Sequence, residues 1–275
     1  MRVKTGIGYR KPLNDWILSQ PDEIDCLELT AEHFYDFPSA TLDKLAAMYP
    51  LYIHSIGLSL GTPGDLDHNL LNKLQTLCER VKPKWISEHI AFTRTESIDL
   101  GHLNPVAPTR KNRNLLVEHA RTLSQFTHCP LILENITYHL QLAGDMRETD
   151  FINAICGGAQ CGLLLDLTNL LVNAKNHCFD PVDWLKQIDP SYITQLHIVG
   201  FSKTHQYYED FHSEAIQSEL YRLLEVLSQH AQPEAVVIER DRNFPAVQQL
   251  ANELIQIKDI FHDTQSNTRS CAAAS

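Results

Sequence analysis

The chain has 275 residues, 43% of them hydrophobic, and a formal net charge of -11. Such a chain can bury a large core, and no run of about 18 apolar residues suggests a membrane span. Its first ten residues, MRVKTGIGYR, lack the apolar stretch of a secretory signal, so we expect a cytoplasmic protein without a membrane partner. The acidic balance argues against nucleic acid as a partner, because phosphate backbones are bound mainly by Lys and Arg. The seven cysteines form no C-x-x-C pair, which argues against a disulfide framework or a thiolate zinc site.

Short apolar runs recur along the chain, each followed by a polar or amphipathic stretch. Runs such as LILE, GLLLD and AVVIE are apolar at consecutive positions, which is typical of parallel strands buried on both faces. We expect eight strands, at Val3–Tyr9, Ile24–Thr30, Leu51–Ile56, Trp85–Phe92, Leu131–Glu134, Gly162–Leu167, Ile193–Val199 and Ala235–Glu239.

Between these runs lie segments with the apolar spacing of helices, for example Asp67–Val81, Asn112–Phe126 and Ser213–His230. Eight strand-then-helix units favour an α/β fold in the form of one closed (β/α)₈ barrel, a TIM barrel. An open doubly wound sheet is the alternative, and the glycine-rich motifs of its nucleotide-binding versions are absent from the sequence. We predict a TIM-barrel catalytic domain over residues 1–263 and a disordered tail over residues 264–275.

Residues of metal-ligand type stand at the ends of six expected strands. They are His54, His89, Glu134, Asp166, His197 and Glu239, and a loop after the seventh strand adds Asp210 and His212. The carboxyl ends of barrel strands converge on one rim, where buried carboxylates without counter-charge would cost several kcal/mol each. Cations would offset that cost and bind these groups. We therefore predict a metal cluster, with Glu134 as the candidate bridging ligand.

Each of these residues also has an ordinary structural interpretation. His54 alone would suit a hydrogen-bonded core histidine, Asp166 a helix N-cap, and the Asp210-x-His212 pair a solvated face. Strand alternation sends Glu88 to the side opposite His89, in a structural or supporting role. The joint pattern on six strands favours metal binding over these separate interpretations.

The pattern resembles the endonuclease IV branch of the xylose-isomerase-like barrels, which holds three zinc ions. That resemblance implies three sites: His54, His89 and Glu134; Glu134, Asp166, His197 and Glu239; and Asp210 with His212. The endonuclease completes its third site with a histidine three residues after the strand-six aspartate. Here that residue is Asn169, a departure that argues against zinc and against phosphodiester hydrolysis.

A closer resemblance covers nearly the whole chain. The segments HSIGLSLG (54–61), LILENITY (131–138) and LLLDLTNLLVNAKN (163–176), with GIGYR, LELTAEHF, SEH, QLHIVG and IERD, are similar to the multinuclear non-heme iron-dependent oxidative enzymes. The best-known member of that family works in methanobactin biosynthesis. The resemblance implies two or three iron ions, with O₂ as co-substrate, that oxidise a cysteine or a neighbouring residue of a ribosomally made peptide. It also implies a small partner protein that recognises the leader of that peptide.

In this interpretation His54, His89 and Glu134 are the catalytic ligands, a 2-His-1-carboxylate set that suits oxygen-activating iron. Asn169 fits beside Asp210 and His212 in the third site. We expect Asn135, Arg240 and Asp241 to orient ligands, and Arg10 either to meet a substrate carboxylate or to form a surface salt bridge. Three alternatives remain: a zinc phosphodiesterase of the endonuclease IV type, a sugar isomerase, and a non-catalytic metal-binding protein. The same ligands accept zinc or manganese.

Overall fold

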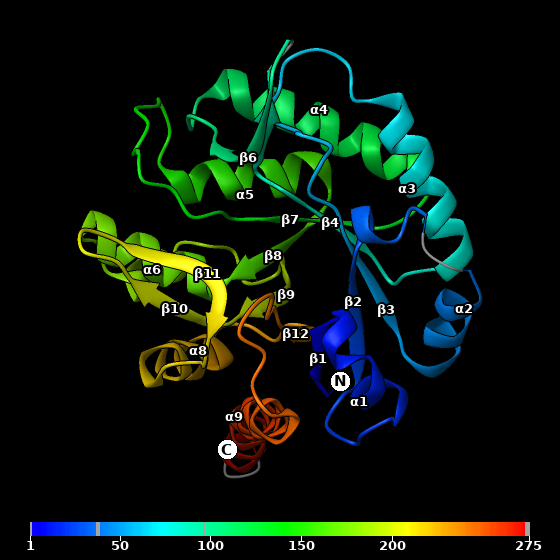
Figure 1. The fold of residues 1–275 in the computed structure, drawn as a ribbon. Helices are drawn as coiled ribbons and strands as arrows, with labels where there is room; N and C mark the ends of the chain where they lie inside the picture. Colours follow the sequence, from blue (N-terminus) through cyan, green and yellow to red (C-terminus); the bar gives the residue numbers. More distant parts are fainter. Residues whose placement is uncertain (1, 37–38, 96, 273–275) are drawn as a thin grey trace.

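The computed structural model describes residues 2–36, 39–95 and 97–272, and its centre is a closed barrel of eight parallel strands (Figure 1). Around the barrel the strands follow the order β1-β12-β9-β8-β7-β4-β3-β2. Each barrel strand overlaps one of the eight predicted runs, so the (β/α)₈ fold is confirmed. The strands are β1 (Lys4–Gly8), β2 (Cys26–Thr30), β3 (Leu51–His54), β4 (Ile86–His89), β7 (Leu131–Glu134), β8 (Gly162–Asp166), β9 (Ile193–Ile198) and β12 (Ala235–Ile238).

Helices cover the outside of the barrel, and none in the described part of the chain is long and apolar enough to cross a membrane. They are α1 (Asn14–Leu18), α2 (Ser39–Met48), α3 (His68–Val81), α4 (Arg110–Thr127), α5 (Glu148–Ala159), α6 (Leu167–His177), α7 (Pro181–Leu185), α8 (Ser218–His230) and α9 (Val247–Ala272), with short 3₁₀ turns at Lys11–Leu13 and Ala31–His33.

The local sequence explains where these helices begin. The carboxylate of Asp67 accepts hydrogen bonds from the backbone N–H groups of Asn69 and Leu70, and so satisfies donors that the first turn of α3 leaves free. Thr109 caps α4 in the same way through the N–H of Asn112. The helices predicted around α3 and α4 are therefore confirmed, and their caps set their first residues.

One helical prediction differs from the structure. The helix predicted from Ser213 begins only at Ser218, because residues 208–214 form β11 (Tyr208–Glu214), which pairs with β10 (Gly200–Lys203). At the C-terminal end, α9 extends into the segment 264–275 as far as Ala272. Residues 273–275 lie outside the described part.

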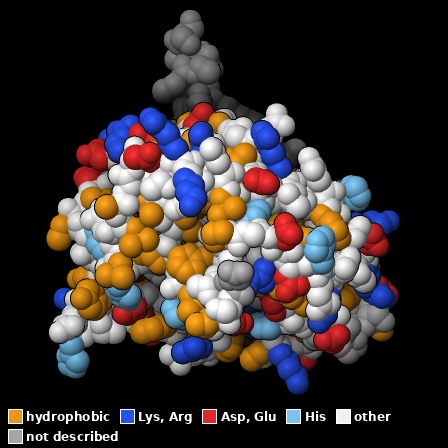
Figure 2. Space-filling model, turned by 90° about the horizontal axis from the view of Figure 1, so that it is seen from above, with side chains coloured by type: hydrophobic (Ala, Val, Ile, Leu, Met, Phe, Trp, Pro, Cys, Tyr) orange, Lys and Arg blue, Asp and Glu red, His pale blue; other side chains and the backbone are white. Residues whose placement is uncertain are grey.

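Two antiparallel hairpins extend from the carboxyl ends of barrel strands. β5 (Ala91–Arg94) pairs with β6 (Asp99–Pro105) after β4, and β10 pairs with β11 after β9. Exposed large hydrophobic side chains gather on these hairpins and on the loops after β3 and β7, and Figure 2 shows such side chains spread over the left and centre of one face. They include Ile56, Ile98, Leu140, Leu142, Tyr207 and Phe211.

The inside of the barrel holds a small apolar layer, separate from the larger core between strands and helices. Within it the rings of Tyr52 and Trp85 stack with centroids 4.2 Å apart. Side chains two residues apart on a strand point to the same face. Residues two positions after members of this layer therefore also face the barrel interior, which gives the pairs Tyr52 and His54, Ile132 and Glu134, Leu164 and Asp166, and Val237 and Glu239.

Candidate metal centre

Strand register places the predicted ligands side by side at the carboxyl end of the barrel. His89 on β4 is the register partner of Glu134 on β7, and Asp166 on β8 is the partner of His197 on β9. All four side chains are buried. The barrel therefore gathers these groups at one mouth, as the sequence predicts.

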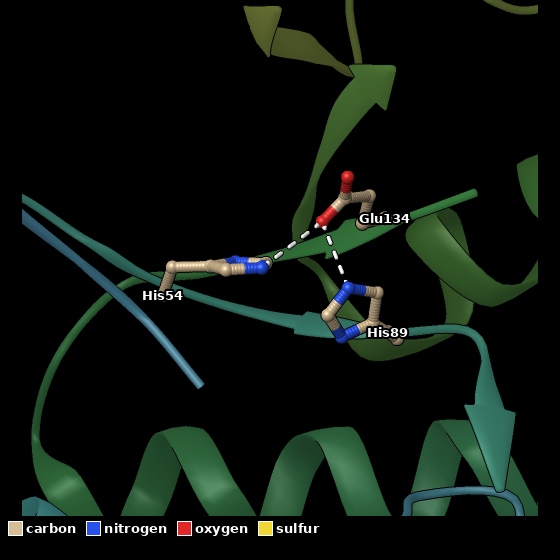
Figure 3. A group of neighbouring side chains, drawn as sticks. All are labelled: His54, His89 and Glu134. Atoms are coloured by element: carbon tan, nitrogen blue, oxygen red, sulfur yellow. Dashed lines mark ion pairs between the residues drawn. The ribbon is translucent and has the colours of Figure 1, made fainter. Parts of the chain in front are cut away.

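The first group contains His54, His89 and Glu134 (Figure 3). The Nε2 atoms of His54 and His89 lie 3.5 and 3.2 Å from the same carboxylate oxygen, Glu134 Oε2. That oxygen is buried and has no hydrogen-bond partner among the described residues. Two imidazole nitrogens and one carboxylate oxygen thus point at one another around a common centre.

The second group contains Glu134, Asp166, His197 and Glu239, whose ligand atoms lie within 4.8 Å of one another. His197 Nδ1 is 3.2 Å from Glu134 Oε1 and 3.2 Å from Glu239 Oε2. Glu134 therefore turns one oxygen to each group, which is the arrangement that a bridging carboxylate requires.

The third group differs in part from the predicted one. His212 Nδ1 faces Asp241 Oδ2 at 3.2 Å and Glu239 Oε2 at 3.7 Å, so Asp241 joins the grouping as a potential ligand. Asp210 lies on the other side of the ring, with its Oδ2 3.2 Å from His212 Nε2. That Oδ2 is also buried without a hydrogen bond within the described chain.

Asn169 lies in the first turn of α6, beside Asp166. Its backbone N–H donates to Asp166 Oδ1 at 2.8 Å, so Asp166 caps the helix as well as facing the cluster. The Asn169 side-chain amide donates to the carbonyl oxygen of Asn135 at 3.1 Å. Asn135 in turn exchanges two hydrogen bonds with the backbone of Asp166, which fixes the ends of β7 and β8 together.

Charge crowding shifts the pKa values of groups in the cluster. Burial, with the nearby Asp210 and Glu134 carboxylates, raises the pKa of Asp166 to about 8. Burial opposes protonation of His89, but Glu134 and Glu88 outweigh it and raise the pKa of His89 to about 10. Burial would likewise raise the pKa of Glu134, yet the surrounding imidazoles hold that pKa below its ordinary value. Without a cation, the cluster therefore retains protons at neutral pH to limit its negative charge.

The donor set fits metal ions. Imidazole nitrogens and carboxylate oxygens are ligands for iron, zinc and manganese, and a cation would both supply the missing partner of Glu134 Oε2 and displace the retained protons. Buried carboxylates held this close together are otherwise expensive. These groups could hold metal ions.

Further residues orient the histidines of these groups. His197 Nε2 lies 2.8 Å from Glu28 Oε1, His54 Nδ1 lies 2.8 Å from Ser87 Oγ, and His89 Nδ1 lies 3.3 Å from Glu88 Oε1. Each contact uses the ring nitrogen that faces away from the cluster, which fixes the ring and directs its other nitrogen inward.

Sequence reasoning missed Glu28, which lies in the middle of β2 and not at its end. Strand alternation indicates its position, because Glu28 follows Cys26 of the inner apolar layer by two residues and so also faces the barrel interior. Arg10 forms salt bridges to Asp241 at 2.5 Å and to Glu239 at 3.5 Å. Of the two roles considered for Arg10, the structure shows the salt bridge.

Arg240, which we expected to orient ligands, contacts residues beside the three groups. It donates to the carbonyl oxygen of Ser213 at 3.0 Å and lies 3.8 Å from Glu253. Its contact with Ser213, next to His212, holds the end of β11 against the barrel.

Comparison with solved structures places the fold among xylose-isomerase-like barrels. The chain resembles a D-psicose 3-epimerase (13% identity, TM-score 0.56, covering 97% of this chain and 98% of that one). It also resembles the IOLI protein with a bound zinc atom (17%, TM-score 0.59, 96% and 99%) and endonuclease IV from Thermus thermophilus (11%, TM-score 0.58, 96% and 99%). At these identities the likeness shows the fold alone.

Sequence relatives span nearly the full length. A UPF0276 protein of Caulobacter vibrioides is 29% identical over 254 residues, covering 90% of this chain and 91% of that protein. One of Shewanella sediminis is 28% identical over 273 residues, covering 96% and 97%. The model of the RiPP precursor modification enzymes MbnB/TglH/ChrH, which act on ribosomally made peptides, matches residues 4–262. The chain therefore belongs to the MbnB/TglH/ChrH family of RiPP precursor modification enzymes.

Proposed function

We propose that the protein is a multinuclear iron-dependent oxidase that uses O₂ to modify a cysteine, or a residue beside it, in a ribosomally made peptide. Family membership supports the peptide substrate. The observation that carries the metal chemistry is the division of Glu134, whose Oε2 faces His54 and His89 while its Oε1 faces His197.

His54, His89 and Glu134 would hold the first iron, and Asp166, His197 and Glu239 would join Glu134 around the second. Iron bound by two histidines and one carboxylate offers open positions for O₂ and for a substrate thiolate. The chain itself fixes the ligands: Ser87, Glu88 and Glu28 each hold the outer nitrogen of one histidine. This is the arrangement needed to keep ligand geometry constant through a reaction.

For a third ion we propose His212 with Asp210 and Asn169. The alternative set is His212 with Glu239 and Asp241, which lie near the Nδ1 atom of His212. Asp210→Asn and Asp241→Asn distinguish the two sets, because only the change at a true ligand lowers the number of ions bound per chain.

A small leader-recognition protein is the partner that we propose. Exposed hydrophobic side chains on the loops and hairpins at the carboxyl ends of the barrel strands support a surface for a peptide or partner, since large exposed apolar patches mark interaction sites.

The test combines metal analysis with oxygen uptake. Protein purified without oxygen should contain about two or three irons per chain and consume O₂ with a cysteine-containing synthetic peptide, but not with its serine counterpart. Zinc content together with cleavage of DNA at abasic sites would support the phosphodiesterase instead. Tight metal binding without oxygen uptake, for every cysteine peptide and with the partner present, would favour a non-catalytic metal-binding protein.

A further inference from the structure

A pocket of about 470 Å³ lies beside the candidate metal centre. Its lining includes Ile90 and Asn135, which directly follow the proposed ligands His89 and Glu134 on β4 and β7. We propose that this pocket binds a bulky apolar side chain of the peptide substrate, next to the residue that faces the metal ligands. This inference rests on the proposed function for the identity of the peptide.

The walls of the pocket are mainly apolar. They include Ile136, Met146, Phe151, Ile152 and Trp184, contributed by the β7–α5 loop, α5 and α7. The volume lies within the range of about 300–1,000 Å³ that is typical of ligand sites. It therefore has room for a large side chain together with part of its backbone.

Hydrogen bonds hold the pocket in shape. Glu148 Oε2 accepts from Trp184 Nε1 at 2.8 Å and from the Tyr138 hydroxyl at 3.3 Å. The Tyr138 N–H donates to Asn173 Oδ1 at 3.0 Å, and the ring of His177 stacks on Tyr138 with centroids 4.8 Å apart. Two aromatic walls are thus fixed before any ligand arrives, which lowers the entropy cost of binding.

The charge around the pocket selects against acidic side chains. Glu148, Asp180 and Asp183 line it, while the lining Arg147 is paired with Asp150 at 2.7 Å. An anionic side chain would meet carboxylates without a free cation in this lining. A neutral apolar side chain avoids that repulsion and gains from burial.

Continuity with the metal ligands argues for a peptide side chain as the occupant. An extended chain advances about 3.3 Å per residue, so a peptide with one residue at the ligands places a neighbouring side chain at Ile90 and Asn135. The outer rim carries Leu140 and Leu142, which are 71% and 38% exposed and which such a side chain would cover.

Binding of small peptides to the full-length, metal-loaded protein tests the inference. The probes are the acetylated, amidated dipeptides Phe-Cys, Gly-Cys, Asp-Cys and Phe-Ala, and the signal is the change in Trp184 fluorescence, with Trp184→Phe identifying that signal. We expect Phe-Cys to bind about tenfold more tightly than Gly-Cys, and Asp-Cys to bind no better than Gly-Cys. Leu142→Asp should abolish the preference for Phe. Ile255→Asp, at a similarly exposed position (41%) on α9, should preserve it.

Equal affinity for Phe-Cys and Gly-Cys, or a preference that survives in Leu142→Asp, would overturn the pocket assignment. The Phe-Ala probe separates this failure from failure of the proposed function. Tight binding of Phe-Ala with no oxidation of any cysteine peptide would support the pocket while refuting cysteine oxidation. If Phe-Cys and Gly-Cys are both oxidised but bind with equal affinity, the result would support cysteine oxidation and refute the pocket assignment.

Discussion

Replacing Glu28 with glutamine should weaken metal binding from outside the ligand set. Glu28 Oε1 lies 2.8 Å from His197 Nε2, and its Oε2 accepts a 2.5 Å hydrogen bond from Gln195. The change Glu28→Gln keeps the size of the side chain but removes the charge that orients His197 and increases its basicity. Loss of such a carboxylate partner typically weakens metal binding 10- to 100-fold, which corresponds to about 1.4–2.8 kcal/mol.

The assay is competition with a chelator of known affinity, followed by elemental analysis of the protein. The effect should be confined to the ion that we propose for Asp166, His197 and Glu239, because His54 and His89 have other partners in Ser87 and Glu88. The chelator should therefore remove the ion of this second group before the ion of the first group, His54, His89 and Glu134.

Glu148→Gln provides the matched control, since Glu148 also accepts two hydrogen bonds but contacts Tyr138 and Trp184, not a metal ligand. Its metal affinity should stay at the wild-type level. If Glu28→Gln binds both ions as tightly as this control does, the orienting role of Glu28 is wrong.

Three further predictions concern the cluster and its support. Glu134→Ala should remove metal from the first and second sites together and abolish turnover; full metal content by elemental analysis would contradict the bridging role. In chelator-treated protein the melting temperature should fall as pH rises from 6 to 9. The folded chain keeps protons at Asp166 (pKa about 8, against 3.8 unfolded) and at His89 (pKa about 10, against 6.5 unfolded) that the unfolded chain releases. The melting temperature of the metal-loaded protein should depend less on pH, and equal slopes for the two forms would refute this account. Glu32→Ala should lower the free energy of unfolding in urea by about 1–3 kcal/mol, because Glu32 Oε1 accepts from the N–H groups of Ile56 and Gly57, and a loss below about 0.5 kcal/mol would show that water replaces it.

The barrel strands could be predicted because each is a continuous apolar run, and a chain with eight such runs separated by helical segments has few alternative folds. The hairpins could not be predicted. Residues 91–94 and 208–214 are only partly buried, and their pairing depends on partners in the hairpin and not on an apolar pattern. For the same reason the helix expected from Ser213 begins five residues late.

The candidate ligands at strand ends were predictable because chemistry and position coincide there. The third group was less so, since Asp241 and His212 approach each other only through the fold of the β11 hairpin against the segment after β12. Sequence spacing indicates Asp210 and His212 as a pair, and in the structure Asp210 contacts Nε2 of the His212 ring. The other ring nitrogen, Nδ1, faces Glu239 and Asp241.

Alternation along the strands links the stability of this barrel to its chemistry. The same inward face that carries Ile132 and Leu164 in the apolar layer carries Glu134 and Asp166 two residues further along each strand. A one-residue slip in register would turn both the core and the ligands outward, so the packing that stabilises the barrel also fixes the ligands. The charged layer adds a cost that protons or cations must offset, and the raised pKa of Asp166 is the sign of that cost. A barrel built in this way should gain stability on binding metal, because the bound ions replace protons that the folded chain otherwise has to retain.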